Sequence, residues 1–202
     1  MINKKILIFN YGTGNFESIY NVMRKFSNYV YVGNSKSSIK SADLIILPGV
    51  GTYYAAMENM KKNNSITNLK KYIKSGKNVL GICLGLQLLS HSSTEIKPTI
   101  GLKFISSKVD KNKKNYHIGW NKIIIKKNNF LNSLNGKYFY FQHTYKLYNH
   151  KNLDFFGYCF HKNEKILSLI KKDNIFGIQF HPEKSQNNGI LFFDEYFKKI
   201  YE

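Results

Sequence analysis

Arginine is almost missing from this chain of 202 residues, although the chain is strongly basic. It has 31 lysine and arginine residues against 12 aspartate and glutamate residues, for a formal net charge of +19, and Arg24 is its single arginine. Base-edge and phosphate contacts favour the planar guanidinium group of arginine. Lysine is instead abundant together with asparagine, isoleucine, tyrosine and phenylalanine, as is typical of AT-rich coding sequences. We therefore expect no nucleic-acid partner.

Long apolar runs, cysteines and prolines are also scarce. No stretch approaches the roughly 18 apolar residues of a membrane span, so we expect no membrane contact. The apolar run at residues 6–9 is too short for a secretory signal, which predicts a cytoplasmic protein. Two cysteines make no disulfide framework. Three prolines and the absence of a linker-like tract predict one domain spanning residues 1–202.

The first half of the chain alternates apolar segments with helical patterns. We expect strands at residues 5–9, 29–32, 44–47 and 78–82, and helices at 15–27, 53–62, 66–75 and 84–90. Such alternation predicts a parallel sheet covered on both faces. The second half favours antiparallel strands at residues 100–109, 122–126, 137–145, 155–160, 166–171 and 174–179, then a helix at 188–201. The predicted fold class is α/β, a three-layer sandwich with a mixed, mostly parallel central sheet.

A cysteine stands where a buried strand is predicted to meet a helix. The stretch GICLGLQ at residues 81–87 has the G-x-nucleophile-x-G spacing of the strained elbow found in hydrolases. At a helix N-terminus the thiolate form of Cys83 is favoured. A lone cysteine in an apolar stretch is more often a core residue, so catalysis needs a second signal.

That second signal follows the last predicted strand, in the stretch GIQFHPE at residues 177–183. His181 can take a thiol proton and later protonate a leaving amine. Glu183 can fix the imidazole tautomer and support its positive form. Since reacting groups gather at the carboxyl ends of strands in such sheets, the two stretches together predict cysteine-dependent catalysis.

A glycine-rich turn at residues 48–51 follows the apolar strand 44–47. Its glycines permit positive φ, so that the amides of Val50 and Gly51 can point inward. With the amide of Leu84 they could form an oxyanion hole. Without the cysteine, an ordinary strand-to-helix turn would be the preferred interpretation.

These motifs together resemble the class I (triad) glutamine amidotransferases, whose elbow reads G-x-C-x-G-x-Q and whose acid–base pair reads H-P-E. The resemblance implies that Cys83 is the nucleophile, His181 the base and Glu183 the orienting acid. It implies glutamine as substrate and no metal or organic cofactor. The substrate contacts that it implies are Gly49, Gln87, Thr144 and Tyr145.

Further stretches are similar to the glutaminase subunit of imidazole glycerol phosphate synthase, an enzyme of histidine biosynthesis. They are NYGTGN at residues 10–15, HIGWN at 117–121, YFQHTY at 140–145 and the Lys-Ser pair at 184–185. This resemblance covers nearly the whole chain. It implies a heterodimer in which ammonia passes to a (β/α)₈ cyclase subunit.

Two alternatives stay open from the sequence. The first is a paralogous amidotransferase that supplies ammonia for surface-sugar biosynthesis, because Asn10, Tyr116 and Lys61 depart from the family pattern and fold and triad alone do not fix a partner. The second is a non-catalytic redox-sensing binding module that uses Cys83 as an exposed thiol. The intact pair of His181 and Glu183 argues against the second.

The other histidines and the second cysteine receive structural interpretations. His91, His150 and His161 have no neighbours at metal-ligand spacing, so we expect no metal site and interpret them as surface or satisfied polar groups. Cys159 lies in an apolar strand and is expected in the core. The Gly-Thr-Gly at residues 12–14 lacks the rest of a dinucleotide fingerprint and is interpreted as a tight turn.

Overall fold

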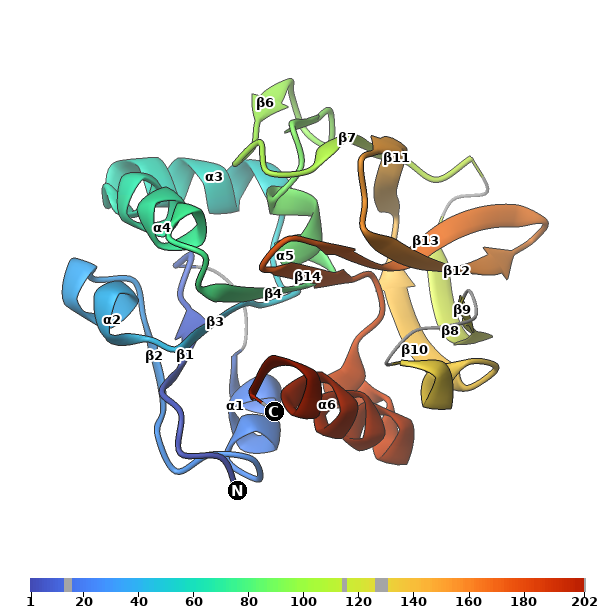
Figure 1. The fold of residues 1–202 in the computed structure, drawn as a ribbon. Coiled ribbons are helices and arrows are strands. Elements are labelled where there is room, and N and C mark those ends of the chain that lie inside the picture. Colours follow the sequence, from blue (N-terminus) through green and yellow to red (C-terminus); the bar gives the residue numbers. More distant parts are fainter. Residues whose placement is uncertain (13–15, 114–115, 126–130, 202) are drawn as a thin grey trace.

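The structure is a computed structural model that describes residues 1–12, 16–113, 116–125 and 131–201, apart from the side chains of Asn149 and His150. Parts of the predictions lie outside these residues. They are residues 13–15 of the predicted turn and helix, residue 126 of a predicted strand, and the side chain of His150. Figure 1 shows a central sheet with helices above and below it.

The central sheet, as far as the chain is described, has eight strands in the order β2-β1-β3-β4-β14-β13-β12-β9. The parallel part contains β2 (Val30–Gly33), β1 (Ile6–Phe9), β3 (Leu44–Leu47), β4 (Asn78–Ile82) and β14 (Ile175–Ile178). The antiparallel part contains β13 (Glu164–Lys172), β12 (Phe155–His161) and β9 (Ile124–Ile125). β14 joins the two parts, because it is parallel to β4 and antiparallel to β13.

Helices cover both faces of this sheet (Figure 1). One face packs against α1 (Glu17–Met23) and α6 (Gln186–Tyr201), and the other against α2 (Lys36–Ser41), α3 (Tyr53–Lys62), α4 (Ser65–Lys74) and α5 (Leu84–Leu88). Strand side chains alternate between the two cores, so that Ile6 and Ile8 lie in one while Leu7 and Phe9 lie in the other. The predicted three-layer α/β sandwich with a mixed sheet is confirmed.

Two smaller sheets lie beside the carboxyl ends of the central strands. One pairs β8 (His117–Lys122) with β10 (Tyr138–His143), and the other has the order β11 (Tyr145–Lys151), β7 (Ser106–Lys111), β5 (Ser92–Ser93) and β6 (Thr99–Ile100). Two 3₁₀ turns complete the description, η1 (Asn132–Leu134) and η2 (Pro182–Lys184). The His181 amide donates to the Tyr140 carbonyl at 2.8 Å, which fixes β10 beside the end of β14.

Several predicted boundaries were wrong. The strand expected at 100–109 is two strands, β6 and β7, because the chain turns at Lys103 (φ +65°). Leu102 and Ile105, which lie between the two strands, are buried in the core on the α2–α5 side of the central sheet. The strand expected at 137–145 is divided at Thr144, where the chain passes from β10 to β11 in a different sheet. The helix expected at 84–90 ends at Leu88. The helix α2, whose N-cap Ser35 accepts a hydrogen bond from the Ser38 amide, was not predicted.

Candidate active site

Cys83 occupies a strained turn between β4 and α5. Its backbone has φ +47° and ψ −103°, a conformation that a non-glycine residue rarely adopts and that costs on the order of 1–3 kcal/mol. Both flanking glycines are sterically required. A Cβ on Gly85 would lie 1.9 Å from the Leu47 carbonyl oxygen, and one on Gly81 would lie 2.7 Å from the Leu86 nitrogen. The strained strand-to-helix turn that the G-x-C-x-G spacing predicts is therefore present at Cys83.

His181 reaches Cys83 because β4 and β14 are neighbouring parallel strands. Ile82 and Ile178 are register partners, and the Cys83 amide donates to the Ile178 carbonyl at 2.7 Å. Gly49 marks the meeting point, since a Cβ there would lie 2.8 Å from Cys83 Cβ and 2.9 Å from His181 Cε1. Three segments that are distant in sequence thus converge at one point.

Glu183 completes a buried charge arrangement. Its Oε1 lies 2.7 Å from His181 Nδ1, and both side chains are almost fully buried. Burial lowers the pKa of His181, but the negative charge and hydrogen bonds of Cys83 and Glu183 outweigh it and raise the pKa to about 10. The site therefore favours the imidazolium form of His181, with Nδ1–H donating to Glu183.

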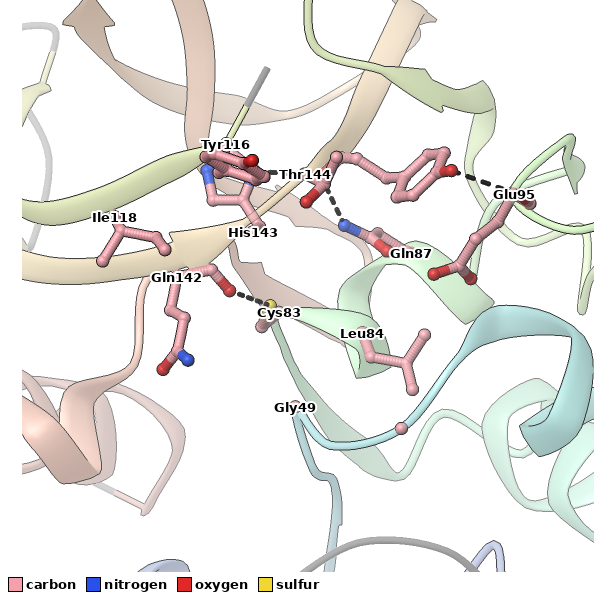
Figure 2. Close-up of a pocket in the computed structure, with 12 residues that line it drawn as sticks. Gly49, Cys83, Leu84, Gln87, Glu95, Tyr116, Ile118, Gln142, His143 and Thr144 are labelled. Atoms are coloured by element: carbon pink, nitrogen blue, oxygen red, sulfur yellow. Dashed lines mark hydrogen bonds between the residues drawn. The ribbon is translucent and has the colours of Figure 1, made fainter.

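A cavity of about 290 Å³ opens in front of the Cys83 sulfur. Figure 2 shows Cys83 at its centre, with Gln142 and His143 on one side and Gln87 and Glu95 on another. All four residues predicted to contact the substrate line this cavity, and so do two of the predicted oxyanion-hole residues. They are Gly49, Gln87, Thr144 and Tyr145, with Gly51 and Leu84.

A second cavity, of about 380 Å³, is also lined by the loop at residues 48–51, together with His181 and Glu183. Val50 lines this second cavity, whereas Gly51 (φ +100°) lines both. The loop follows β3, which pairs directly with β4, and the Tyr11 hydroxyl donates to the Pro48 carbonyl at 2.9 Å. The loop that lines both cavities is therefore held in place from two sides.

Glu95 also lines the cavity in front of Cys83, and the sequence motifs did not predict it. It supplies a carboxylate to the wall of the cavity, and its Oε2 accepts from the Tyr53 amide at the start of α3 at 2.6 Å. Burial raises the pKa of Glu95, although the Tyr53 amide acts in the opposite direction. A carboxylate at this position suits the ammonium group of an amino-acid substrate. No local motif marks it, because it sits in an irregular segment between β5 and β6.

His117 and His143 form a hydrogen-bonded chain beside the cavity. The Asn121 amide contacts His117 Nε2, His117 Nδ1 lies 2.9 Å from His143 Nε2, and His143 Nδ1 lies 2.9 Å from the Tyr145 carbonyl. Since that carbonyl only accepts, each ring donates from Nδ1 and accepts at Nε2. Burial is the main cause that lowers the pKa of His117 to about 3 and the pKa of His143 well below its ordinary value. Both rings are thus neutral and orient the cavity wall.

The interpretation of His161 as a surface or satisfied group was wrong. Its ring stacks on His117 with centroids 4.3 Å apart, and its Nε2 is buried without a hydrogen-bond partner among the described residues. The cause is that β12 ends beside β8 of another sheet, a contact that residue spacing does not reveal. His91 is exposed and Cys159 is fully buried, as expected.

Within the described ranges, no group of three or more His, Cys, Asp or Glu side chains is arranged to hold a metal ion. Among the same residues, no helix has the length and apolar character needed to cross a bilayer.

Comparison with known proteins agrees with this geometry. The family model described as glutamine amidotransferase class-I matches residues 7–199. The imidazole glycerol phosphate synthase subunit HisH of Sulfurimonas denitrificans is 35% identical over 202 residues, covering 96% of this chain and 97% of the relative. The subunit HisH of Caldanaerobacter subterraneus is 38% identical over 188 residues, covering 91% and 92%.

Solved structures share the fold at low sequence identity. The structure of PurLQS from Thermotoga maritima superposes with a TM-score of 0.76 at 16% identity, covering 98% of this chain and 100% of the other. A crystal structure of a glutamine amidotransferase gives a TM-score of 0.74 at 11% identity, covering 96% and 99%.

Proposed function

The chain belongs to the class-I glutamine amidotransferases, in the branch of the HisH subunits of imidazole glycerol phosphate synthase, and on that premise we propose that Cys83, His181 and Glu183 are its catalytic triad. The proposed reaction is hydrolysis of glutamine to glutamate and ammonia for histidine biosynthesis, by a single domain. The observation that carries it is the convergence of a strained cysteine elbow with a buried His–Glu pair on adjacent parallel strands.

The first half-reaction forms a thioester. The Cys83 thiolate attacks the side-chain amide carbon of glutamine, and negative charge develops on the amide oxygen. Backbone amides of Gly51 and Leu84, with Val50 in the same loop, are the proposed donors to this oxyanion. The His181 imidazolium then protonates the amide nitrogen, the carbon–nitrogen bond breaks and ammonia departs.

The second half-reaction returns the enzyme to its resting state. Neutral His181 takes a proton from water, which attacks the thioester carbon. The carbon–sulfur bond breaks, the electron pair returns to the Cys83 sulfur, and glutamate leaves. Glu183 stabilises the imidazolium that forms in this step. Gly49, Gln87, Thr144 and Tyr145 would hold the substrate, and Glu95 would pair with its ammonium group.

Cysteine replacement tests the triad. In the presence of the partner subunit, Cys83→Ala should abolish ammonia release from glutamine, whereas the matched variant Cys159→Ala should retain it. Cys159 is the right control because it is also a buried free thiol, but burial raises its pKa to about 11 and it lies in the core. Equal ammonia release by the native chain and Cys83→Ala would rule out the triad.

The proposed partner is a (β/α)₈ cyclase subunit that receives the ammonia as one half of a heterodimer. The plant relative hisHF of Arabidopsis thaliana supports a close association, because this chain matches only 32% of that longer synthase at 34% identity. The docking face would be the β8–β10 sheet, where Ile118, Trp120 and Tyr138 are about half exposed. Such an interface should bury more than about 1,000 Å².

We propose that ammonia leaves toward this face through the second cavity. It is lined by His181, which protonates the leaving group, and by Gln142 and Lys184, which are hydrogen-bonded at 2.9 Å beside β10.

Co-purification with a cyclase chain and formation of imidazole glycerol phosphate by the pair test the proposal. Glutaminase activity without that product would favour the surface-sugar paralogue. The redox-module alternative requires an exposed thiol, and Cys83 is only 6% exposed.

A further inference from the structure

A fully buried glutamine touches the sulfur of Cys83. Gln179 is the first residue after β14, and its Nε2 donates to Cys83 Sγ at 3.5 Å. The backbone holds both residues in place, since the Gln179 amide donates to the Ser168 carbonyl at 2.8 Å and the Cys83 amide donates to the Ile178 carbonyl at 2.7 Å. The contact is therefore built into the pairing of β13, β14 and β4.

The hydrogen bonds of Gln87 determine which end of the Gln179 amide faces the sulfur. The Tyr145 carbonyl can only accept, so the nitrogen of the Gln87 side chain must point to it, at 2.8 Å. The same nitrogen donates to Gln179 Oε1 at 3.3 Å. With Oε1 engaged, the Nε2 donor of Gln179 is the atom left to face Cys83.

A donor at this position favours the charged form of the sulfur. The titratable side chains that face the sulfur are His181, which hydrogen-bonds to it, and Tyr11. A further hydrogen bond of Cys83 Sγ runs to the Gln142 carbonyl, at a longer 3.9 Å, and it can form only while the sulfur keeps its hydrogen. An N–H group pointing at a thiolate forms a charge-assisted bond, which is stronger than a neutral one. We propose that Gln179 is a positioning residue that orients the Cys83 sulfur and stabilises its thiolate, an inference that rests on the nucleophilic role proposed for Cys83.

This role extends over both half-reactions. The bond is strongest before attack, weakens when the sulfur is acylated, and forms again when the carbon–sulfur bond breaks. Gln179 therefore stabilises the attacking group of the first step and the leaving group of the second. Gln87 acts one step further away, by holding the Gln179 amide in the required orientation.

The test measures alkylation of Cys83 by iodoacetamide as a function of pH, in a Cys159→Ala background without glutamine or partner. Methionine matches glutamine in length but donates no hydrogen bond, so Gln179→Met should raise the pH midpoint of alkylation by about one pH unit. Gln179→Glu places a second negative charge beside the sulfur and should raise the midpoint further. The control Gln186→Met makes the same chemical change at an exposed position and should leave the midpoint unchanged.

An unchanged midpoint in folded Gln179→Met or Gln179→Glu overturns the inference. A measurement on the native side chain covers the case in which neither variant folds. The Gln179 side-chain amide resonance should then shift with the same midpoint as alkylation in the Cys159→Ala protein, and a static resonance would contradict the inference. The outcome is separable from that of the proposed function, which fails instead if alkylation of Cys83 leaves ammonia release with the partner intact.

Discussion

Replacing Glu183 with glutamine gives the sharpest test of the charge arrangement at the site. The substitution keeps an oxygen that can accept from His181 Nδ1, at present 2.7 Å away, and removes only the negative charge. The pKa of His181 is about 10, against an ordinary value near 6.5, and Glu183 is one of the causes that raise it. Loss of that charge should therefore lower the pKa of His181.

The size of the effect follows from the burial of the pair. An opposite charge at this distance typically shifts a pKa by about 1–3 units, so a fall to about 8 is the central expectation. At pH 9 the protonated fraction of His181 would then drop from about nine-tenths to about one-tenth. In the proposed mechanism protonated His181 releases ammonia, so the alkaline decline of activity should move to lower pH by about two units, with a tenfold loss at pH 9.

Two measurements check this expectation. One is ammonia release with the partner subunit between pH 6 and pH 11, and the other is an NMR titration of the His181 imidazole. Glu58→Gln is the matched control, because Glu58 also lies 2.6 Å from a basic side chain, Lys61, but at an exposed position. A Glu183→Gln protein whose His181 titrates at the native midpoint would refute the electrostatic account.

The same raised pKa predicts how stability depends on pH. A group whose pKa is higher in the folded protein stabilises the fold fully below its unfolded value, near 6.5. That contribution is lost as pH rises through the folded value, about 10 for His181. The free energy of unfolding should therefore fall between these limits in the native chain, and less steeply in Glu183→Gln, as urea titrations at several pH values would show.

Three further substitutions probe other parts of the structure. Gly85→Ala should destabilise the fold by about 3 kcal/mol or more in urea unfolding, because the new Cβ would meet the Leu47 carbonyl at 1.9 Å. Glu95→Gln should raise the KM for glutamine roughly 10–100-fold and change kcat less, if its carboxylate pairs with the substrate ammonium. Lys146→Met should cost about 1–3 kcal/mol at neutral pH by leaving the partly buried Glu164 carboxylate, 2.6 Å away, without its cation. Burial raises the pKa of Glu164 but Lys146 lowers it further, so this cost should shrink as the pH falls below about 4.

The predictable parts of the molecule are those determined by local patterns. The four apolar residues of β3 are buried on both faces. Their apolar run predicted the strand, and the alternation of strands with helices predicted that it lies in a parallel sheet. The positions of Cys83 and His181 followed from motifs placed at strand ends. Their proximity was also predictable, because parallel neighbours bring their carboxyl ends to the same edge of a sheet.

The parts that were missed depend on contacts between distant segments. Glu95 reaches the cavity from an irregular segment, and no spacing rule marks it. The contacts of His117 and His161 depend on where β8 and β12 lie. β8 pairs with β10 in a separate sheet that the sequence patterns did not predict. Gln179 lay inside a recognised motif, but its contact with the sulfur is visible only in three dimensions.

The place of β14 also has a consequence for synthesis of the chain. A nascent polypeptide that has left the ribosome only as far as β13 contains Cys83 but lacks His181 and Gln179, both of which follow β14. Its sulfur then has neither the imidazole nor the amide donor beside it. On the proposed roles of these residues, Cys83 is activated only when β14 inserts between β4 and β13, so the cell would not meet an activated cysteine on an unfinished protein.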